Sequence, residues 1–321
     1  MKVGFFTEGG FEGKIPKDYN NMRTDAAWMY LIDATHHPLF KINTLSDNTY
    51  DVGVMILPKK RQMYMNFPLL KEYQRVCKKV TVMQESYWNY WQDSPIEEQI
   101  WYFNFITDMD IIFCHNDIDS NYYNGLTKVR TELLPTVMIT DGISKRIDKL
   151  KDSYNDIDST FSHKQKDVII GGNWVKDYGG FDSYQVALEI TDDITAITTG
   201  RMKSEEKNLF KHLDWMPWSE WIKTLSQYNI GVQLGTAAAG TFNLNCSYHG
   251  IPCIAYSNSN TQRILHPKTT VELGDIVGAK EIARKLKDKD FYDECMKETT
   301  KNYEKYYSEE KFLEHWNRVW N

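Results

Sequence analysis

Cysteine is scarce in this sequence and poorly placed for a disulfide framework or a zinc site. Five cysteines occur among 321 residues, an odd number, and none belongs to a C-x-x-C pair. Such spacing is typical of reduced thiols. The N-terminal MKVGFF lacks a signal-peptide pattern, and no apolar run approaches the length of a membrane span. We therefore expect a cytoplasmic protein with no membrane partner.

Common nucleotide-binding and hydrolase motifs are also missing. No G-x-G-x-x-G follows a predicted strand, which disfavours a nicotinamide enzyme, and no G-x-x-x-x-G-K-[ST] occurs, which disfavours P-loop phosphoryl transfer. The absence of G-x-S-x-G disfavours the usual hydrolase fold. The formal net charge of −6 excludes a chain that binds nucleic acid through its overall charge, although Lys59–Arg61 and Lys78–Lys79 are local basic clusters.

What is present is a globular composition, with 41% hydrophobic and 26% charged residues. A chain of 321 residues suits two domains. Strand and helix patterns alternate along the chain, except in the polar stretch Ser144–Lys166, which predicts an inter-domain linker or a surface excursion. The alternation predicts parallel sheets covered by helices on both faces, an α/β fold.

In the first half, the expected strands are Lys2–Thr7, Lys41–Leu45, Val52–Leu57, Val80–Gln84, Met109–Cys114 and Thr136–Thr140. The expected helices run from Asn21 or Thr24 to His36, then Pro68–Lys79, Pro95–Ile106 and Asn121–Leu126. In the second half, the expected strands are Asp167–Ile170, Ile194–Thr198, Ile230–Leu234 and Ile251–Tyr256. The expected helices there are Ser183–Ile190, Thr241–Gly250, Lys280–Lys287, Asp290–Thr300 and Tyr303–Trp320.

The stretch Trp215–Tyr256 is the most informative part of the chain. Its loop Gly235–Gly240 carries no bulky side chain and leads into a predicted helix. A bare loop before a helix N-terminus lets main-chain N–H groups approach an anion, and the helix dipole favours negative charge there. The pattern thus predicts a diphosphate site. The alternative is an ordinary βαβ unit whose loop is small for packing reasons.

Two segments of the second half resemble GT-B glycosyltransferases. HLDWMPWSEWIKTLSQYNIGVQL is similar to the segment that contacts the nucleotide base, and NCSYHGIPCIAY is similar to the helix–Gly–Pro–strand unit of that family. Where many members have a glutamate that holds the donor ribose or sugar, this chain has Asn245. The resemblance implies two Rossmann-like domains facing across a cleft. It implies an acceptor domain at 1–160, a nucleotide-sugar domain at 161–302, and a C-terminal helix at 303–321 that returns to the first domain.

A narrower resemblance is to phage DNA glucosyltransferases of the T-even β-glucosyltransferase type. The motifs DVIIGGNW, DWMPWSEW and VTVMQESYWNYWQDSP carry it. It implies a hydroxymethylated base in double-stranded DNA as the acceptor, an infected host cell as the location, and Glu85 as the catalytic base.

Glycosyl transfer with inversion needs a base for the acceptor hydroxyl and charge stabilisation for the departing diphosphate. Asp25, at the first turn of the helix after the glycine loop Glu8–Gly13 (EGGFEG), is the first candidate base, Glu85 the second and His115 the third. Arg23 and Trp28 are expected to contact the acceptor or sugar. The alternatives are that Asp25 is only a carboxylate favoured by the helix dipole, and that His115 is a structural histidine.

The residues expected to bind the donor are Gly10, Gly171, Gly172, Asn173, Lys176, Arg201, Met216, Pro217, Thr236, Thr241, Asn243 and Asn245. For the two cations the alternative is an ordinary surface position, and for Gly171–Asn173 it is a structural tight turn. Asp108 with Asp110, and Asp117 with Asp119, have D-x-D spacing, but their positions at a strand start and a helix cap disfavour a metal site. We expect neither a metal nor a cofactor.

The sequence thus predicts a hexosyl- or pentosyltransferase that takes a sugar from a nucleotide-sugar donor, with a UDP-sugar favoured. The acceptor alternatives to DNA are a polysaccharide, a lipid or a protein. An epimerase or phosphorylase of the same architecture, and a non-catalytic nucleotide-sugar or nucleic-acid binding protein, are the competing classes.

Overall fold

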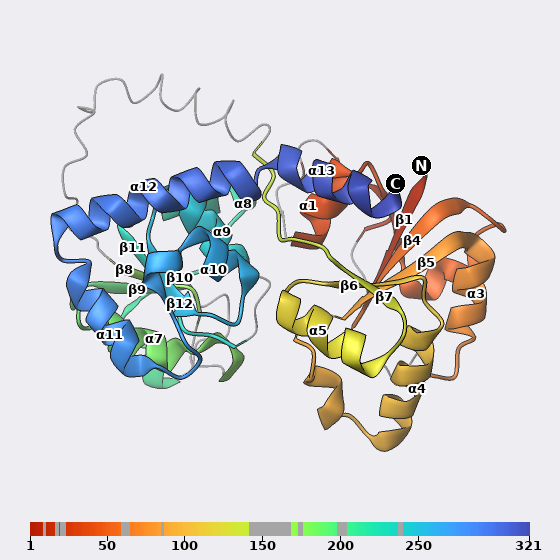
Figure 1. The fold of residues 1–321 in the computed structure, drawn as a ribbon, viewed down its shortest axis with the longest axis horizontal. Helices are drawn as coiled ribbons and strands as arrows, with labels where there is room; N and C mark the ends of the chain where they lie inside the picture. The colour runs from red at the N-terminus through yellow and green to blue at the C-terminus, as the bar shows by residue number, and fades with distance from the viewer. Residues whose placement is uncertain are drawn as a thin grey trace. The chain divides into compact units, whose positions relative to one another are not determined.

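The chain forms two compact units, which we describe separately (Figure 1). Our computed structural model describes residues 1–8, 11–16, 19, 24–58, 65–84, 87–140, 168–172, 176–197, 204–236 and 240–321. Unit 1 comprises Met1–Tyr19, Arg23–Pro135 and Leu313–Asn321, and most of unit 2 is Thr136–Phe312. The predicted linker Ser144–Lys166 and the predicted boundary at residue 160 lie outside the described residues.

Unit 1 is built on a parallel sheet with one antiparallel edge. The strand order is β2-β3-β1-β4-β5-β6-β7, and only β2 runs antiparallel to its neighbour. The strands are β1 (Val3–Thr7), β2 (Gly13–Lys14), β3 (Thr35–Pro38), β4 (Tyr50–Leu57), β5 (Cys77–Gln84), β6 (Ile111–Cys114) and β7 (Arg130–Leu133). The helices are α1 (Thr24–Leu31), η1 (Leu39–Thr44), α3 (Leu69–Val76), η2 (Tyr90–Asp93), α4 (Ile96–Thr107) and α5 (Asp117–Leu126), joined by the end of α13 (Glu309–Trp320).

Alternation along the strands gives this sheet two apolar faces. Ile112 and Cys114 of β6 belong to the main core of unit 1, together with side chains of η1, α3, α4 and α5. The intervening Phe113 points to the other face, where its ring stacks on Trp316 of α13 at 6.0 Å. A strand buried on both faces is the pattern of a parallel sheet covered by two helical layers.

Unit 2 is a fully parallel sheet with the order β10-β9-β8-β11-β12-β13. Its strands are β8 (Val168–Ile170), β9 (Ile194–Ile197), β10 (Lys211–Leu213), β11 (Ile230–Gln233), β12 (Cys253–Tyr256) and β13 (Thr270–Val271). Its helices are η3 (Lys176–Tyr178), α7 (Gly180–Ala187), η4 (Ser204–Glu206), α8 (Trp218–Leu225), α9 (Thr241–Tyr248), α10 (Asn260–Leu265), η5 (Pro267–Thr269), α11 (Ile276–Lys285) and α12 (Lys289–Tyr306).

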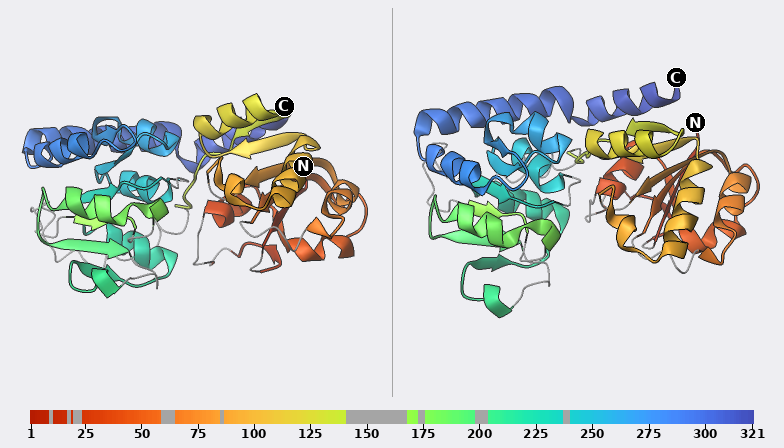
Figure 2. Two further views of the ribbon diagram at one scale, coloured as in Figure 1. Left: turned by 90° about the horizontal axis from the view of Figure 1, so that it is seen from below. Right: turned by 60° about the horizontal axis from the view of Figure 1, so that its bottom comes forward.

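Helices again cover both faces of the unit 2 sheet, as the views in Figure 2 show. Helices α7 and α11 share one core with Val168 and Ile170 of β8. Ile169, between them, lies on the opposite face with Phe242 and Cys246 of α9. The predicted α/β class, with two Rossmann-like units, is confirmed.

Several predicted elements are wrong. Lys41–Leu45 is not a strand but part of the 3₁₀ helix η1, whose Leu39 and Ile42 are buried at the three-residue spacing of such a helix. Thr136–Ile139 is buried and Thr140 is half-buried, but the segment forms no strand. Its Met138 packs in a cluster with helical side chains of α8, α9 and α10. An apolar run alone does not tell a strand from a buried loop.

The helix predicted to reach His36 ends five residues earlier. Asp33 adopts a left-handed conformation with φ 53°. The N–H of Asp33 donates to Tyr30 O at 3.2 Å and that of Ala34 to Met29 O at 2.9 Å, which is the Schellman pattern. The chain then enters β3, so His36 lies in a strand. Similarly, α3 ends at Val76 rather than at Lys79, because β5 begins at Cys77.

Candidate active-site loops

The strand order of unit 2 creates a topological switch point between β8 and β11. The chain proceeds from β8 to β9 and β10 on one side, and from β11 to β12 and β13 on the other. In open parallel sheets, ligands bind outside the carboxyl ends of the strands at such a point. The segments that follow these two strands begin at Gly171 and Leu234. The predicted Gly171–Asn173 turn and the predicted Gly235–Gly240 loop therefore start at the switch point.

Main-chain hydrogen bonds hold these two segments together. The N–H of Gly171 donates to Val232 O at 2.9 Å, and the N–H of Thr236 donates to Asp177 O at 3.0 Å. The carbonyl of Thr236 accepts from the side-chain amide of Asn258 at 2.9 Å. Thr236 itself is exposed. Gly171 and Thr236, both predicted to bind the sugar donor, thus belong to two segments that main-chain hydrogen bonds connect.

Close packing explains the paired glycines. A Cβ on Gly171 would lie 2.6 Å from the Phe242 ring, and one on Gly172 would lie 2.5 Å from Cβ of Tyr178. These distances are shorter than real Cβ contacts, so both positions need glycine for the packing of the loop. The packing supports the structural alternative for these two residues, and their contact with the donor stays a prediction.

Two helices start at the switch point, each directly after a glycine in the left-handed region. Gly179 (φ 59°) precedes α7, and Gly240 (φ 74°) precedes α9, whose first residue is Thr241. Within the described part of the chain, no side chain caps either helix, and the first turn of α9 has no acidic residue. Uncapped first-turn N–H groups and the helix dipole favour an anion at α9, whereas Asp182 in the first turn of α7 places negative charge beside that helix N-terminus.

Asn243 and Asn245 of α9 are buried and already hydrogen-bonded within unit 2. The Asn243 amide donates to Oε1 of Gln262 at 2.6 Å. The Asn245 oxygen accepts from Nε1 of Trp221 at 2.9 Å, and its amide contacts the Met138 sulfur at 3.1 Å. Both side chains thus contribute to the core of unit 2. Their occupied hydrogen-bonding groups favour a structural role over the donor contact that we predicted.

The remaining predicted donor residues are less constrained. Pro217 directly precedes α8, the half-buried Met216 precedes it in turn, and the Trp215 side chain is 61% exposed. Lys176 begins η3. Five predicted site residues lie outside the described residues, and their roles stay predictions: Gly10, Arg23, Glu85, Asn173 and Arg201.

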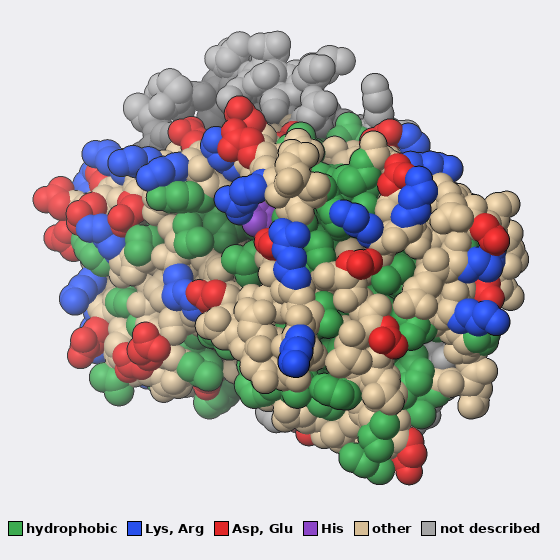
Figure 3. Space-filling model, turned by 45° about the vertical axis from the view of Figure 1, so that its right-hand side comes forward, with side chains coloured by type: hydrophobic (Ala, Val, Ile, Leu, Met, Phe, Trp, Pro, Cys, Tyr) green, Lys and Arg blue, Asp and Glu red, His purple; other side chains and the backbone are tan. Residues whose placement is uncertain are grey.

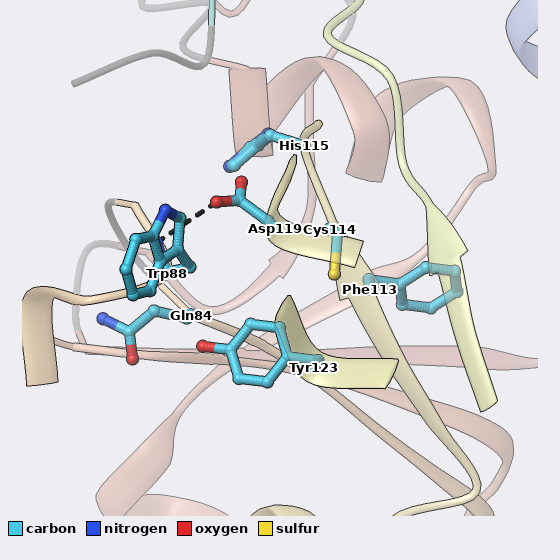
Figure 4. Close-up of a pocket in the computed structure, with 7 residues that line it drawn as sticks. All are labelled: Gln84, Trp88, Phe113, Cys114, His115, Asp119 and Tyr123. Carbon is cyan, nitrogen blue, oxygen red and sulfur yellow. Dashed lines mark hydrogen bonds between the residues drawn. The ribbon is translucent and has the colours of Figure 1, made fainter. Parts of the chain in front are cut away.

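In unit 1, the segments after β5 and β6 enclose a small cavity (Figure 4). Its volume is about 10 Å³, close to that of a single water-sized group. The lining residues are Gln84, Trp88, Phe113, Cys114, His115, Asp119 and Tyr123. Gln84 directly precedes the candidate base Glu85 in the sequence. The cavity therefore brings the end of β5 together with the third candidate base, His115.

Burial makes His115 a weak proton acceptor. The pKa of His115 is lowered to about 4 by burial, and its Nδ1 has no hydrogen-bond partner among the described residues. Its ring stacks on that of Trp28 from α1, with centroids 5.4 Å apart. Trp28 is 1% exposed and donates to Pro135 O at 2.8 Å. For Trp28 this burial favours a packing role beneath His115 over the predicted acceptor contact.

Asp25 lies in the first turn of α1, three residues before Trp28. Helix α1 thus connects the first candidate base to the ring that packs on His115. Burial lowers the pKa of the neighbouring His36, while the negative charge of Asp25 acts to raise it. The Asp25 side chain itself is half-buried.

Asp119 is the residue of this region that sequence reasoning missed. We interpreted its D-x-D spacing as a helix cap, but its side chain is only 6% exposed and lines the cavity. Burial raises the pKa of Asp119 to about 6. A carboxylate with a raised pKa in a pocket is a signature of functional sites. Nothing in the local sequence distinguishes it from the exposed Asp117 two residues earlier.

Metal and membrane signatures are absent from the described residues. No group of three or more histidine, cysteine, aspartate or glutamate side chains there could hold a metal ion. Among the helices of that part of the chain, none is long and apolar enough to cross a membrane. All five cysteines are free and buried.

Two Rossmann-like units in one chain are the architecture of the GT-B class of folds. Solved structures with this fold match the chain over most of its length. No protein-family model matches it, and a search of curated proteins finds no significant match.

The similar structures include HepE and two sugar-phosphate synthases. HepE from Anabaena, crystallised with UDP-glucose, matches with a TM-score of 0.66 and 9% identity, covering 99% of both chains. Trehalose-6-phosphate synthase from Burkholderia multivorans matches with a TM-score of 0.60 and 7% identity, covering 98% of this chain and 90% of that one. Sucrose-phosphate synthase from Thermosynechococcus elongatus matches at 0.62 and 10% identity, covering 84% and 73%. At identities this low, the structural similarity shows a common fold and nothing further.

Proposed function

We propose that this protein is a glycosyltransferase that moves a sugar from a nucleotide-sugar donor, with a UDP-sugar favoured, to an acceptor hydroxyl. The observation that carries the proposal is the β8–β11 switch point of unit 2. Two helices without side-chain caps among the described residues, α7 and α9, begin there beside two glycine-bearing segments. This arrangement suits a diphosphate, whose developing charge on departure would be stabilised by main-chain N–H groups and helix dipoles. The UDP-glucose bound by the similarly folded HepE supports the choice of donor.

In unit 1, the acceptor hydroxyl would lose its proton to a carboxylate. Asp25 remains our first candidate, because the first turn of α1 leaves its side chain half-buried. Glu85 remains the second. The lowered pKa of His115 places it third, since a base with a pKa near 4 binds a proton weakly at neutral pH.

The acceptor is proposed in two versions. The phage resemblance favours 5-hydroxymethylcytosine in double-stranded DNA, which requires a basic face and an extruded base. Two of the predicted basic residues are already engaged: Lys78 pairs with Asp51 at 2.8 Å, and the Lys79 ammonium lies 5.6 Å from the Trp320 ring. Lys and Arg are interspersed with Asp and Glu on the face shown in Figure 3. These features favour a polysaccharide, protein or lipid hydroxyl over DNA.

Donor binding and donor cleavage test the proposal separately. Calorimetric titration with UDP should show binding, and incubation with a panel of nucleotide sugars should release the nucleotide. UDP binding without nucleotide release from any donor, with or without acceptors, would favour a non-catalytic nucleotide-sugar binding protein. If no nucleoside diphosphate binds, the proposal is wrong.

The acceptor is tested with matched DNA duplexes. One duplex carries 5-hydroxymethylcytosine and the other carries cytosine at the same positions, and both are incubated with the donor that the protein cleaves. Sugar transfer to the modified duplex alone would establish the DNA acceptor. Nucleotide release that neither duplex accelerates would direct the search to polysaccharide, protein and lipid acceptors.

A further inference from the structure

The Asp119 carboxylate joins the segments that follow two neighbouring strands of unit 1. Asp119 is the third residue of α5, which begins just after β6. Its Oδ1 accepts a hydrogen bond from the main-chain N–H of Trp88, in the segment after β5, at 3.2 Å. Its Oδ2 accepts from the side-chain amide of Asn116, directly before α5, at 3.4 Å. Figure 4 shows the carboxylate between Trp88 and His115.

Each of the two joined segments follows a strand end that adjoins a candidate base in the sequence, Glu85 after β5 and His115 after β6. His115 directly follows β6, and Gln84, at the end of β5, lines the same cavity as Asp119. We propose that Asp119 is a positioning residue for glycosyl transfer, which fixes the segments after β5 and β6 relative to each other and thereby aligns the groups that meet the acceptor hydroxyl. This inference rests on the proposed function.

A carboxylate suits this place better than an amide would. An ionised carboxyl group only accepts hydrogen bonds, and both of its partners here are donors. An amide in its place would direct an N–H₂ group toward one of them. A second contact between the same elements does not depend on Asp119, because the rings of Trp88 and Tyr122 pack 4.5 Å apart. Removal of the charge should therefore change the alignment and leave the fold in place.

The two hydrogen bonds that Asp119 accepts from Trp88 and Asn116, called the Asp119 tie below, should respond to pH in an accessible range. Its raised pKa of about 6 results from burial, which outweighs the two hydrogen bonds that lower it, and the charge of Asp117 raises it further. The titratable groups around it are Asp117, Cys114, His115, Tyr123 and, through a hydrogen bond to Tyr123, Tyr102. Burial raises the pKa of Cys114 and Tyr123 and lowers that of His115 to about 4, so none of these three changes charge near pH 6.

The first test compares Asp119→Asn with Glu97→Gln. Glu97 is an exposed carboxylate in the first turn of α4, also in unit 1, so its variant controls for the loss of one acidic residue from a helix N-terminus. With the donor that the protein cleaves, we expect Asp119→Asn to lower kcat about 10- to 100-fold, as misplacement of the reacting groups by up to about 1 Å does. The donor KM should stay unchanged. The wild-type kcat should fall as the pH drops below about 6, and the pH profile of the variant should lack this fall.

The inference would be overturned if Asp119→Asn had the same kcat as the wild type, or if its pH profile kept the same fall in kcat below about pH 6. A second readout needs neither turnover nor a variant: the amide proton of Trp88 should titrate in an NMR spectrum with a midpoint near pH 6. If the amide titrates but the wild type cleaves no donor, the proposed function fails and the hydrogen-bonded tie stands. If the Trp88 amide shows no such titration, the tie is absent and the inference is wrong.

Discussion

Gly179 has no room for a side chain. A Cβ there would lie 1.9 Å from the carbonyl oxygen of Leu234, which means that the segment after β8 rests directly on the end of β11. Its φ of 59° adds a second requirement, since other residues pay about 1–2 kcal/mol in this region. The contact joins the two loops of the proposed donor site through main-chain atoms alone.

Gly179→Ala should therefore destabilise unit 2 and weaken UDP binding. The matched control is Gly274→Ala, because Gly274 also has a positive φ, 85°, but a Cβ there would meet no atom within 4 Å. We expect the control to cost about 1–2 kcal/mol and to bind UDP normally. Gly179→Ala should cost several kcal/mol more, as main-chain clashes do. Denaturant unfolding and UDP calorimetry measure the two effects, and equal behaviour of the variants would contradict this interpretation.

His266 is the centre of a buried hydrogen-bond network in unit 2. Its Nε2 lies 2.9 Å from the Asn243 carbonyl oxygen, so Nε2 carries the ring proton and donates a hydrogen bond to that oxygen. Its Nδ1 then accepts from the Thr299 hydroxyl at 3.0 Å and from the Cys253 N–H at 3.3 Å. Protonation of Nδ1 would break both accepted bonds, so this arrangement requires a neutral imidazole.

This network predicts a loss of stability in acid. Burial lowers the pKa of His266 from its ordinary 6.5 to about 4. Between these values the unfolded chain binds the proton and the folded chain does not, so stability falls as the pH drops from about 6.5 to about 4. The loss approaches about 3 kcal/mol at the lower end. Urea unfolding at several pH values should show this slope, and His266→Gln should reduce it. A slope unchanged by the substitution would contradict the assignment, since His115 and His249, with pKa values also lowered to about 4, supply only the remainder.

At the level of elements, α13 completes a layer of unit 1. Trp316 is 3% exposed and stacks on Phe113 of β6, with an interplanar angle of 25°. Arg130 of β7 donates to the Val319 carbonyl at 3.3 Å. The last residues of the chain therefore cover β7, whose Arg130 precedes Val319 by 189 positions, and β6, which lies still further back in the sequence.

Trp316→Ala should destabilise unit 1 by about 3–5 kcal/mol, the usual cost of deleting a buried aromatic side chain. Asn317→Ala is the control, because Asn317 is the exposed next residue of the same helix. We expect the control to stay within about 0.5 kcal/mol of the wild type. Urea denaturation followed by near-ultraviolet circular dichroism would measure both. A Trp316 variant as stable as the control would show that α13 is not needed to cover the sheet.

Elements with strong local patterns were predictable and the others were not. The apolar runs at β4, β11 and β12 identified central strands, since a strand buried on both faces has little choice of residues. The edge strand β7, with the sequence RTEL, has no such pattern and was missed. Edge strands pair on one side only, so their side chains are under weaker constraint.

At the scale of the whole molecule, the proposal divides the reaction between the units, with the donor in unit 2 and the base in unit 1. The proposed division rests on the switch point of unit 2 and on the candidate bases of unit 1, because structures at 7–12% identity show the fold alone and assign no residue roles. Binding and catalysis can therefore be disrupted independently.

Asp25→Asn should abolish sugar transfer and leave UDP affinity nearly unchanged, because the amide is isosteric but cannot accept the proton. Arg201→Ala should instead weaken UDP binding by about 1.5–3 kcal/mol, the value of a charge-assisted hydrogen bond. Calorimetry and nucleotide release distinguish the two effects. Surviving activity in Asp25→Asn would direct attention to Glu85→Gln, and an unchanged UDP affinity in Arg201→Ala would reject that contact.

The sequence by itself determined the α/β class and the central strands, because these depend on local composition and periodicity. Tertiary structure alone decided which side chains are available for chemistry. Asn243 and Asn245 look like ligand contacts in sequence, yet partners from other segments occupy their amides. Asp119 looks like a helix cap, yet the fold buries it beside Trp88, 31 positions away. Burial and long-range hydrogen bonds arise only when distant segments meet, so no local pattern encodes them.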